Sequence, residues 1–131
     1  MAWHLDKSRP ICPQICEQLC VQIAAGELKP NERLLSVREV ALAAGVNPNT
    51  VQKSFEMLEQ QHLIYAVRGS GWFVSEDTDL ARQTVSELIR QTTAAYFAAM
   101  EALGCDAAQT RQAAAAWEPN AENSKEETTH E

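Results

Sequence analysis

The side chains best suited to bind another molecule lie between residues 38 and 71, and their types are those that bind nucleic acid. Amide, hydroxyl and cationic groups follow one another from Asn47 to Lys53. Asn and Gln pair with adenine, while Arg and Lys pair with guanine or with phosphate. A further cation, Arg68, lies in a glycine-rich stretch that can enter the minor groove. The candidate DNA-binding residues are Arg38, Asn47, Asn49, Thr50, Gln52, Lys53, Arg68, Gly69, Ser70 and Gly71.

Such side chains need a rigid element to hold them, and the sequence predicts two short helices joined by a tight turn. Ser36 and Glu39 have the spacing of a capping box. Gly45 supplies the left-handed residue that ends a helix. Asn47 and Pro48 start the next one, with a capping side chain followed by a proline where no amide is needed. This pattern is typical of a helix-turn-helix, whose second helix presents its first residues to the major groove.

The flanking segments predict a third helix before this pair and a two-stranded hairpin after it. The helix is expected over residues 11–25, and Leu34 and Leu35 are expected to anchor a short edge strand. A hairpin around a turn at residues 68–71 is too small to be stable alone, so it must pack on helices. The fold class predicted for residues 1–75 is mostly α with a small β-hairpin, a winged helix-turn-helix. The expected strands are residues 63–67 and 72–75.

Residues 76–117 are expected to form a two-helix dimerisation segment. A long helix is predicted over residues 80–103, with apolar residues three and four apart, and a shorter one over residues 107–117. Two such helices cannot bury a separate core in one chain, so their apolar stripe is expected to meet that of a second copy. The alternative is that they fold back on the winged helix. The residues assigned to the dimer interface are Leu88, Ile89, Tyr96, Met100 and Leu103.

Charge is distributed unevenly along the chain. The net charge is −7, but residues 1–75 hold seven Lys/Arg and seven Asp/Glu, so the excess of acid lies beyond them. Because affinity for the DNA backbone comes from a few nearby cations, the neutral first part is compatible with DNA binding. Residues 118–131 are expected to be a disordered acidic tail. Without an apolar run of membrane-spanning length or a secretory pattern, the protein is predicted to be cytoplasmic.

The cysteines and histidines form no recognisable metal or catalytic pattern. Cys12, Cys16 and Cys20 lie four residues apart on the first predicted helix, and Cys105 is separate. We expect reduced thiols that pack as small core residues, and a redox or metal role of the first three stays an alternative. With no nucleophile–base pair, phosphate loop or metal-ligand spacing, the chain is predicted to be no enzyme and to need no cofactor or metal.

Several short motifs recur in an order that resembles the DNA-binding domain of the GntR family of bacterial transcription regulators. The short helical part that follows resembles the YtrA subfamily. The sequence departs from the family pattern at Leu35, where proline is usual, and at Gln61-His62, where a glycine is usual. The motifs are IAAGELKP (23–30), RL (33–34), SVRE (36–39), GVNPNTV (45–51), LE (58–59), RGSG (68–71) and FV (73–74).

The resemblance implies a repressor that binds a pseudo-palindromic double-stranded DNA operator as a homodimer and controls transporter genes. It also implies a DNA contact for Arg38, for which the alternative is a solvated arginine paired with Glu39 or Glu56. Asn47 has a purely structural alternative as a helix cap. A winged-helix module that binds a protein instead of DNA is the second hypothesis, and a small-molecule effector between the C-terminal helices stays open.

Overall fold

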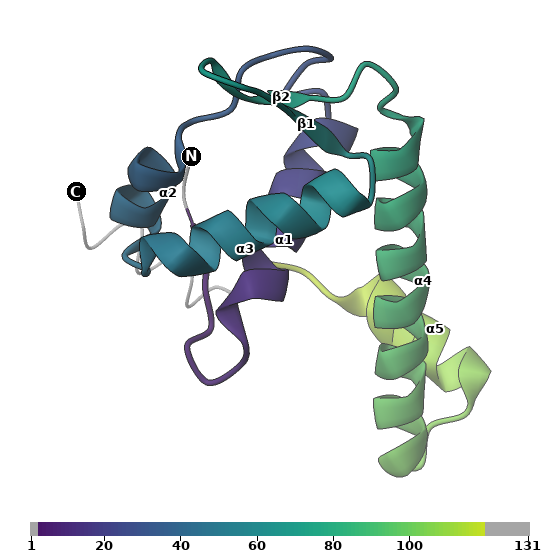
Figure 1. Cartoon of the computed structure of the whole chain (residues 1–131). Coiled ribbons are helices and arrows are strands. Elements are labelled where there is room, and N and C mark those ends of the chain that lie inside the picture. The colour runs from purple at the N-terminus through teal and green to yellow at the C-terminus, as the bar shows by residue number, and fades with distance from the viewer. Residues whose placement is uncertain (1–2, 120–131) are drawn as a thin grey trace, which may run out of the picture. The chain divides into compact units, whose positions relative to one another are not determined.

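The computed structural model describes residues 3–119, and its contacts divide the chain into one unit that ends at Ile89 and another that starts at Arg90. The tail predicted for residues 118–131 lies outside the described residues from position 120 onward. Figure 1 labels the elements in chain order. They are α1 (Ile11–Ala24), α2 (Val37–Ala44), α3 (Pro48–Gln60), β1 (Ile64–Val67), β2 (Gly71–Val74), α4 (Asp79–Ala102) and α5 (Ala107–Ala116).

Helices α2 and α3 begin and end where their capping residues place them. Ser36 Oγ accepts a hydrogen bond from the Glu39 amide, and the Glu39 carboxylate accepts one from the Ser36 amide, each at 3.1 Å. The bond from the Ser36 amide holds the pKa of Glu39 below its usual value. Gly45 ends α2 in the left-handed region with φ 68°, and Asn47 Oδ1 caps α3 through the Asn49 amide at 2.8 Å. The predicted helix-turn-helix is confirmed.

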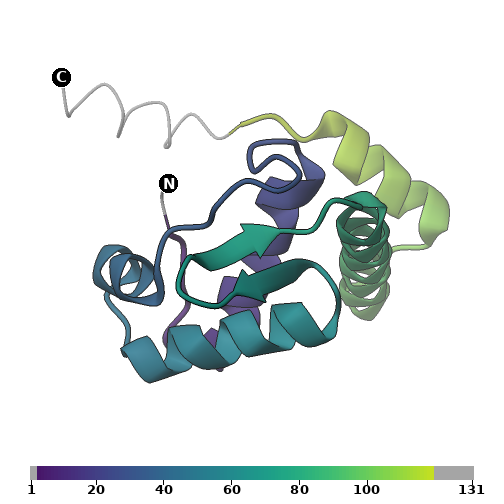
Figure 2. The same cartoon turned by 45° about the horizontal axis from the view of Figure 1, so that its top comes forward.

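The hairpin is held against α3 by an aromatic contact in the core. Val51, Phe55 and Leu58 of α3 have the spacing of one helical face, and all three point inward and are buried. The Phe55 ring meets Trp72 of β2 edge-on, with ring centroids 5.6 Å apart and planes at 74°. Figure 2 shows the hairpin running alongside α3. The buried core side chains are Ile15, Leu19, Cys20, Ile23, Leu34, Val40, Ala41, Val51, Phe55, Leu58, Leu63, Ile64, Val74 and Ala81.

The two strands pair antiparallel, and the segment before α2 runs beside the second of them. The edge strand predicted at Leu34 and Leu35 is wrong in extent, because only an isolated bridge between Arg33 and Phe73 forms. The Leu34 amide donates to the Trp72 carbonyl at 2.8 Å, whereas Leu35 turns its side chain to solvent. The paired residues of the hairpin are Ile64 with Val74, Tyr65 with Phe73, Ala66 with Trp72 and Val67 with Gly71.

The turn between α3 and β1 has a histidine in a left-handed conformation and lacks the glycine usual in the resembling family. His62 adopts φ 62°, a left-handed conformation that costs glycine less than other residues. Its amide donates to the Glu59 carbonyl at 2.9 Å, and the Leu63 amide donates to the Leu58 carbonyl at 3.0 Å. These two bonds pair carbonyl groups in the last turn of α3. They fix the turn after which β1 begins.

Helices α4 and α5 match the predicted ones to within one residue at each end. In the first unit, Ala81 on α4 is fully buried in the winged-helix core. In the second unit, Asp106 and Gln109 form a capping box at the start of α5, and the Arg111 guanidinium lies 5.7 Å from the centre of the Phe97 ring. No helix among residues 3–119 is long and apolar enough to span a membrane.

Candidate nucleic-acid interface

The segments that carry the candidate residues lie together on one side of the first unit. Figures 1 and 2 both place the turn at residues 68–70 on the same side as α2 and the N-terminal end of α3. We call these three segments the helix–wing face: α2, residues 48–53 and residues 68–70. The fold therefore brings together residues that are up to 33 positions apart in the sequence, as a winged helix requires.

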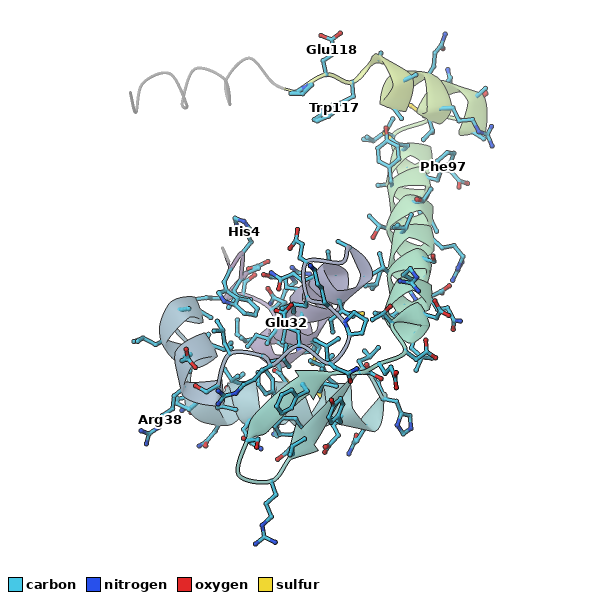
Figure 3. All side chains as sticks on the ribbon, turned by 90° about the horizontal axis from the view of Figure 1, so that it is seen from above. His4, Glu32, Arg38, Phe97, Trp117 and Glu118 are labelled. Atoms are coloured by element: carbon cyan, nitrogen blue, oxygen red, sulfur yellow. The ribbon has the colours of Figure 1, made fainter. Side chains whose placement is uncertain are left out.

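The cations of the helix–wing face have no carboxylate partners among the described residues. Arg38, Lys53 and Arg68 are exposed, and Figure 3 shows the Arg38 side chain pointing outward from α2. The alternative pairing of Arg38 with Glu39 or Glu56 does not occur. Each of these cations is therefore available to a phosphate or a base. Elsewhere in the described part of the chain, ion pairs join Arg9 to Asp6 and Arg82 to Asp79.

The first turn of α3 presents amides and short polar side chains. The side-chain oxygen of Asn47 caps α3, so Asn47 has the structural role of a helix cap. Its side-chain amide nitrogen is still available to donate a hydrogen bond. Asn49 is exposed, and Thr50 is half-buried at the edge of the face. Free backbone amides and the positive end of the helix dipole make this turn suited to a phosphate group.

Gln52 and Glu56 form a polar pair one helical turn apart on the outside of α3. The Gln52 amide nitrogen donates to Glu56 Oε1 at 3.1 Å, which leaves the Gln52 oxygen and one N–H available. Gln at such a position pairs with adenine, and a carboxylate accepts a hydrogen bond from cytosine. Lys53 lies next to this pair and is exposed. The pair therefore offers groups that can form hydrogen bonds with base edges. The negative charge of Glu56 lowers the attraction of α3 for phosphate.

The wing has a second cation that sequence reasoning missed. The turn is closed by the Ser70 amide, which donates to the Val67 carbonyl at 2.9 Å, and Arg68 is exposed on it. At its base, a Cβ built on Gly71 would lie 3.3 Å from Arg33 Nε, so the Arg33 side chain passes directly over that glycine. The motif Arg33-Leu34 was the available signal, but the sequence does not show that Arg33 meets the wing.

The four cysteines are free thiols. Of the three on α1, Cys20 is buried in the core, Cys16 is half-buried and packs against the core, and Cys12 is half-buried. Burial raises the pKa of the Cys16 thiol to about 12, and burial also raises the pKa of Cys20. These two thiols therefore stay protonated at neutral pH and are poor nucleophiles. Within residues 3–119, no group of three His, Cys, Asp or Glu side chains is placed to hold a metal ion.

The winged helix and its polar face can now be compared with known proteins. The family model described as "Bacterial regulatory proteins, gntR family" matches residues 13–74, a range that contains the whole helix–wing face. A solved GntR family transcriptional regulator from Listeria monocytogenes is 32% identical with a TM-score of 0.79, over 87% of this chain and 100% of that one. The chain belongs to the GntR family.

Two curated Bacillus subtilis proteins resemble this GntR chain in sequence. YhcF, an uncharacterized HTH-type transcriptional regulator, is 33% identical over 77% of this chain and 84% of its own length. YtrA, an HTH-type transcriptional repressor, is 41% identical over 53% of this chain and 54% of its own length. Membership of the GntR family confirms the predicted fold class. It also makes the chain a DNA-binding transcriptional regulator and not an enzyme.

Proposed function

We propose that this GntR regulator is a repressor that binds a pseudo-palindromic operator as a homodimer. The observation that carries the proposal is the helix–wing face, where unpaired cations from α2, α3 and the wing share one side of the winged helix. In this arrangement α3 would enter the major groove, and Arg68 would enter the adjacent minor groove. Two copies related by a two-fold axis would place their α3 helices about 34 Å apart, one turn of duplex.

The residues proposed to contact DNA have different tasks. Gln52 and Asn49 are suited to base edges, and Lys53 to guanine or the backbone. Asn47 and Thr50 would meet a phosphate at the start of α3. Arg38 would hold the backbone or a guanine beside it, and Arg33 joins the wing base as a phosphate contact. The similarity to YtrA, which is named a repressor, supports repression. The targets we propose are neighbouring transporter genes.

Binding to the upstream region of its own gene is expected to be specific and strongly salt-dependent. If Arg33, Arg38, Lys53 and Arg68 of two chains all met phosphates, log K would fall with log salt with a slope as steep as about −7. Fluorescence anisotropy with that duplex and with a scrambled duplex of equal length measures both quantities. Equal affinity for the two duplexes at every salt concentration would refute the operator. Absent DNA binding together with a captured protein partner would favour the protein-interaction alternative.

The dimer is expected because the second unit lacks a core of its own. Of residues 90–119, only Thr110 is buried. Large apolar side chains on α4 remain at the surface: Ile89 is 61% exposed, Tyr96 38% and Leu103 77%, whereas Leu88 and Met100 are half-buried. We propose that these five side chains pack against the same residues of a second chain.

Sedimentation equilibrium of the protein is expected to give twice the mass of one chain. The protein concentrations used are those at which the operator is fully bound. Leu103→Lys is expected to shift the mass toward one chain, because it places a charge in the apolar interface. Val21→Lys is the matched control, since Val21 is also exposed but lies on α1, outside the helix–wing face. A monomer mass for the unmodified protein bound to operator would contradict the proposed assembly.

A further inference from the structure

Three sulfur atoms from two helices meet on the side of α1 that faces α3. Cys12 Sγ lies 3.3 Å from Met57 Sδ, and Cys16 follows Cys12 one helical turn later on α1. Ser54 contacts both thiols, because its hydroxyl lies 3.3 Å from Cys12 Sγ. Cys16 Sγ also donates to the Ser54 carbonyl at 3.3 Å. Met57 is 45 positions away from Cys12 in the sequence, so only the packing of α3 on α1 completes the group.

The three residues that carry these sulfur atoms are partly exposed to solvent. Cys12 and Cys16 are half-buried, and Met57 is 37% exposed. A hollow of about 180 Å³ opens beside Cys16 and Met57, and Glu17 and Cys20 also border it. The Cys20 thiol is directed elsewhere, because it donates to the Ala81 carbonyl at 3.6 Å. The accessible group therefore consists of two thiols and one thioether.

The donor types select the kind of ion. Thiolate and thioether sulfur are soft ligands that favour Cu(I), whereas Mg²⁺ and Ca²⁺ prefer oxygen and a structural Zn²⁺ site needs four ligands. The described residues offer no third His, Cys, Asp or Glu that would complete a site for such ions. With metal–sulfur bonds of about 2.3 Å, sulfur ligands around a three-coordinate ion lie about 4 Å apart. Cys12 Sγ and Met57 Sδ, now 3.3 Å apart, would reach this spacing by moving slightly away from each other.

We propose that Cys12, Cys16 and Met57 form a three-sulfur site for one Cu(I) ion per chain, between α1 and α3. The ion would replace the thiol protons, which pass to solvent, and it would enter and remain as Cu(I), so that no electron is transferred. Bound there, it would join α1 to the helix that carries Gln52 and Lys53.

The test uses the reduced full-length chain without DNA, so its result does not depend on the proposed operator. Cu(I) is titrated under anaerobic conditions in the presence of bicinchoninate, whose coloured Cu(I) complex reports the ion that the protein does not hold. The unmodified chain is expected to withhold one equivalent. Met57→Leu keeps the size of the side chain but removes its sulfur. Because loss of an outer-shell partner already costs about 10–100-fold in metal affinity, loss of this ligand is expected to cost at least about tenfold.

Cys105→Ser is the matched control, since it removes a thiol from the second unit and is expected to leave Cu(I) retention unchanged. Cys12→Ser combined with Cys16→Ser is expected to abolish retention, and circular dichroism reports whether each variant is folded. Three results would overturn the proposal: no retention by the unmodified chain, full retention by Met57→Leu, or equal loss in Cys105→Ser. A Zn²⁺ titration in which that ion is held as firmly as Cu(I) would also contradict a soft three-sulfur site.

Discussion

Replacing both Arg38 and Lys53 with alanine is expected to weaken operator binding by about 2 kcal/mol or more, roughly thirtyfold, since each contact of this kind contributes about 1–3 kcal/mol. Both side chains are exposed and have no ion-pair partner within residues 3–119. Removing them therefore deletes cations that the fold does not otherwise use, and folding stability should hardly change. Anisotropy titrations at several salt concentrations measure the affinity and its salt slope, which should become shallower by about 1 for each lost phosphate contact.

The matched control for this double variant is Arg82→Ala. Arg82 is a cation of the same unit, but it is paired with Asp79 at the start of α4. Its removal is expected to leave operator affinity and salt slope nearly unchanged. If the Arg38 and Lys53 substitutions also leave the affinity unchanged, the assignment of the helix–wing face as the DNA contact is wrong. If Arg82→Ala weakens operator binding as much as they do, the loss of affinity comes from the change in overall charge and not from a local DNA contact.

Phe55→Ala is expected to cost about 3–5 kcal/mol of unfolding free energy, the usual range for removing a buried aromatic ring. Phe55 is fully buried and joins α3 to the hairpin through its edge-on contact with Trp72. Because domains of this size are stable by only about 5–15 kcal/mol, this loss removes at least about a fifth of the unfolding free energy. Urea unfolding followed by circular dichroism, at one fixed protein concentration, measures the loss.

Tyr65→Ala provides the comparison for Phe55→Ala. Tyr65 is an aromatic residue of the same hairpin, stacked on Phe73 with centroids 5.6 Å apart, but it is 37% exposed. Its removal should therefore cost clearly less. A loss below about 1 kcal/mol for Phe55→Ala, far from the range for buried rings, would show that the hairpin does not depend on α3.

The parts of the fold that could be predicted from the sequence are those fixed by neighbouring residues. Ser36 and Glu39, Gly45 and Asn47 each act within a few positions, so the ends of α2 and α3 followed from local chemistry. The inward face of α3 followed from the helical spacing of its apolar residues. Residue types and spacing indicated that DNA is the binding partner. Membership of the GntR family then established it.

The sequence could not show contacts made between distant segments. Ser54 is polar, yet it is fully buried, and its hydroxyl lies 2.9 Å from the Thr50 carbonyl and 3.1 Å from the Cys12 carbonyl. The approach of Cys12 to Met57 and of Arg33 to Gly71 likewise depends on how α1, the wing and the preceding segment pack. Residue type and local spacing contain no information about such pairs.

The close approach of Arg33 to Gly71 restricts how the wing can be redesigned. Gly71 has φ 117°, a backbone conformation that side-chain-bearing residues rarely adopt, and any Cβ there would crowd the Arg33 guanidinium. A library intended to alter groove preference should therefore randomise positions 68–70 and retain the glycine that follows. Wing loops transplanted from other proteins would need a glycine at their last position, because a side chain at this φ is strained even if Arg33 moves away.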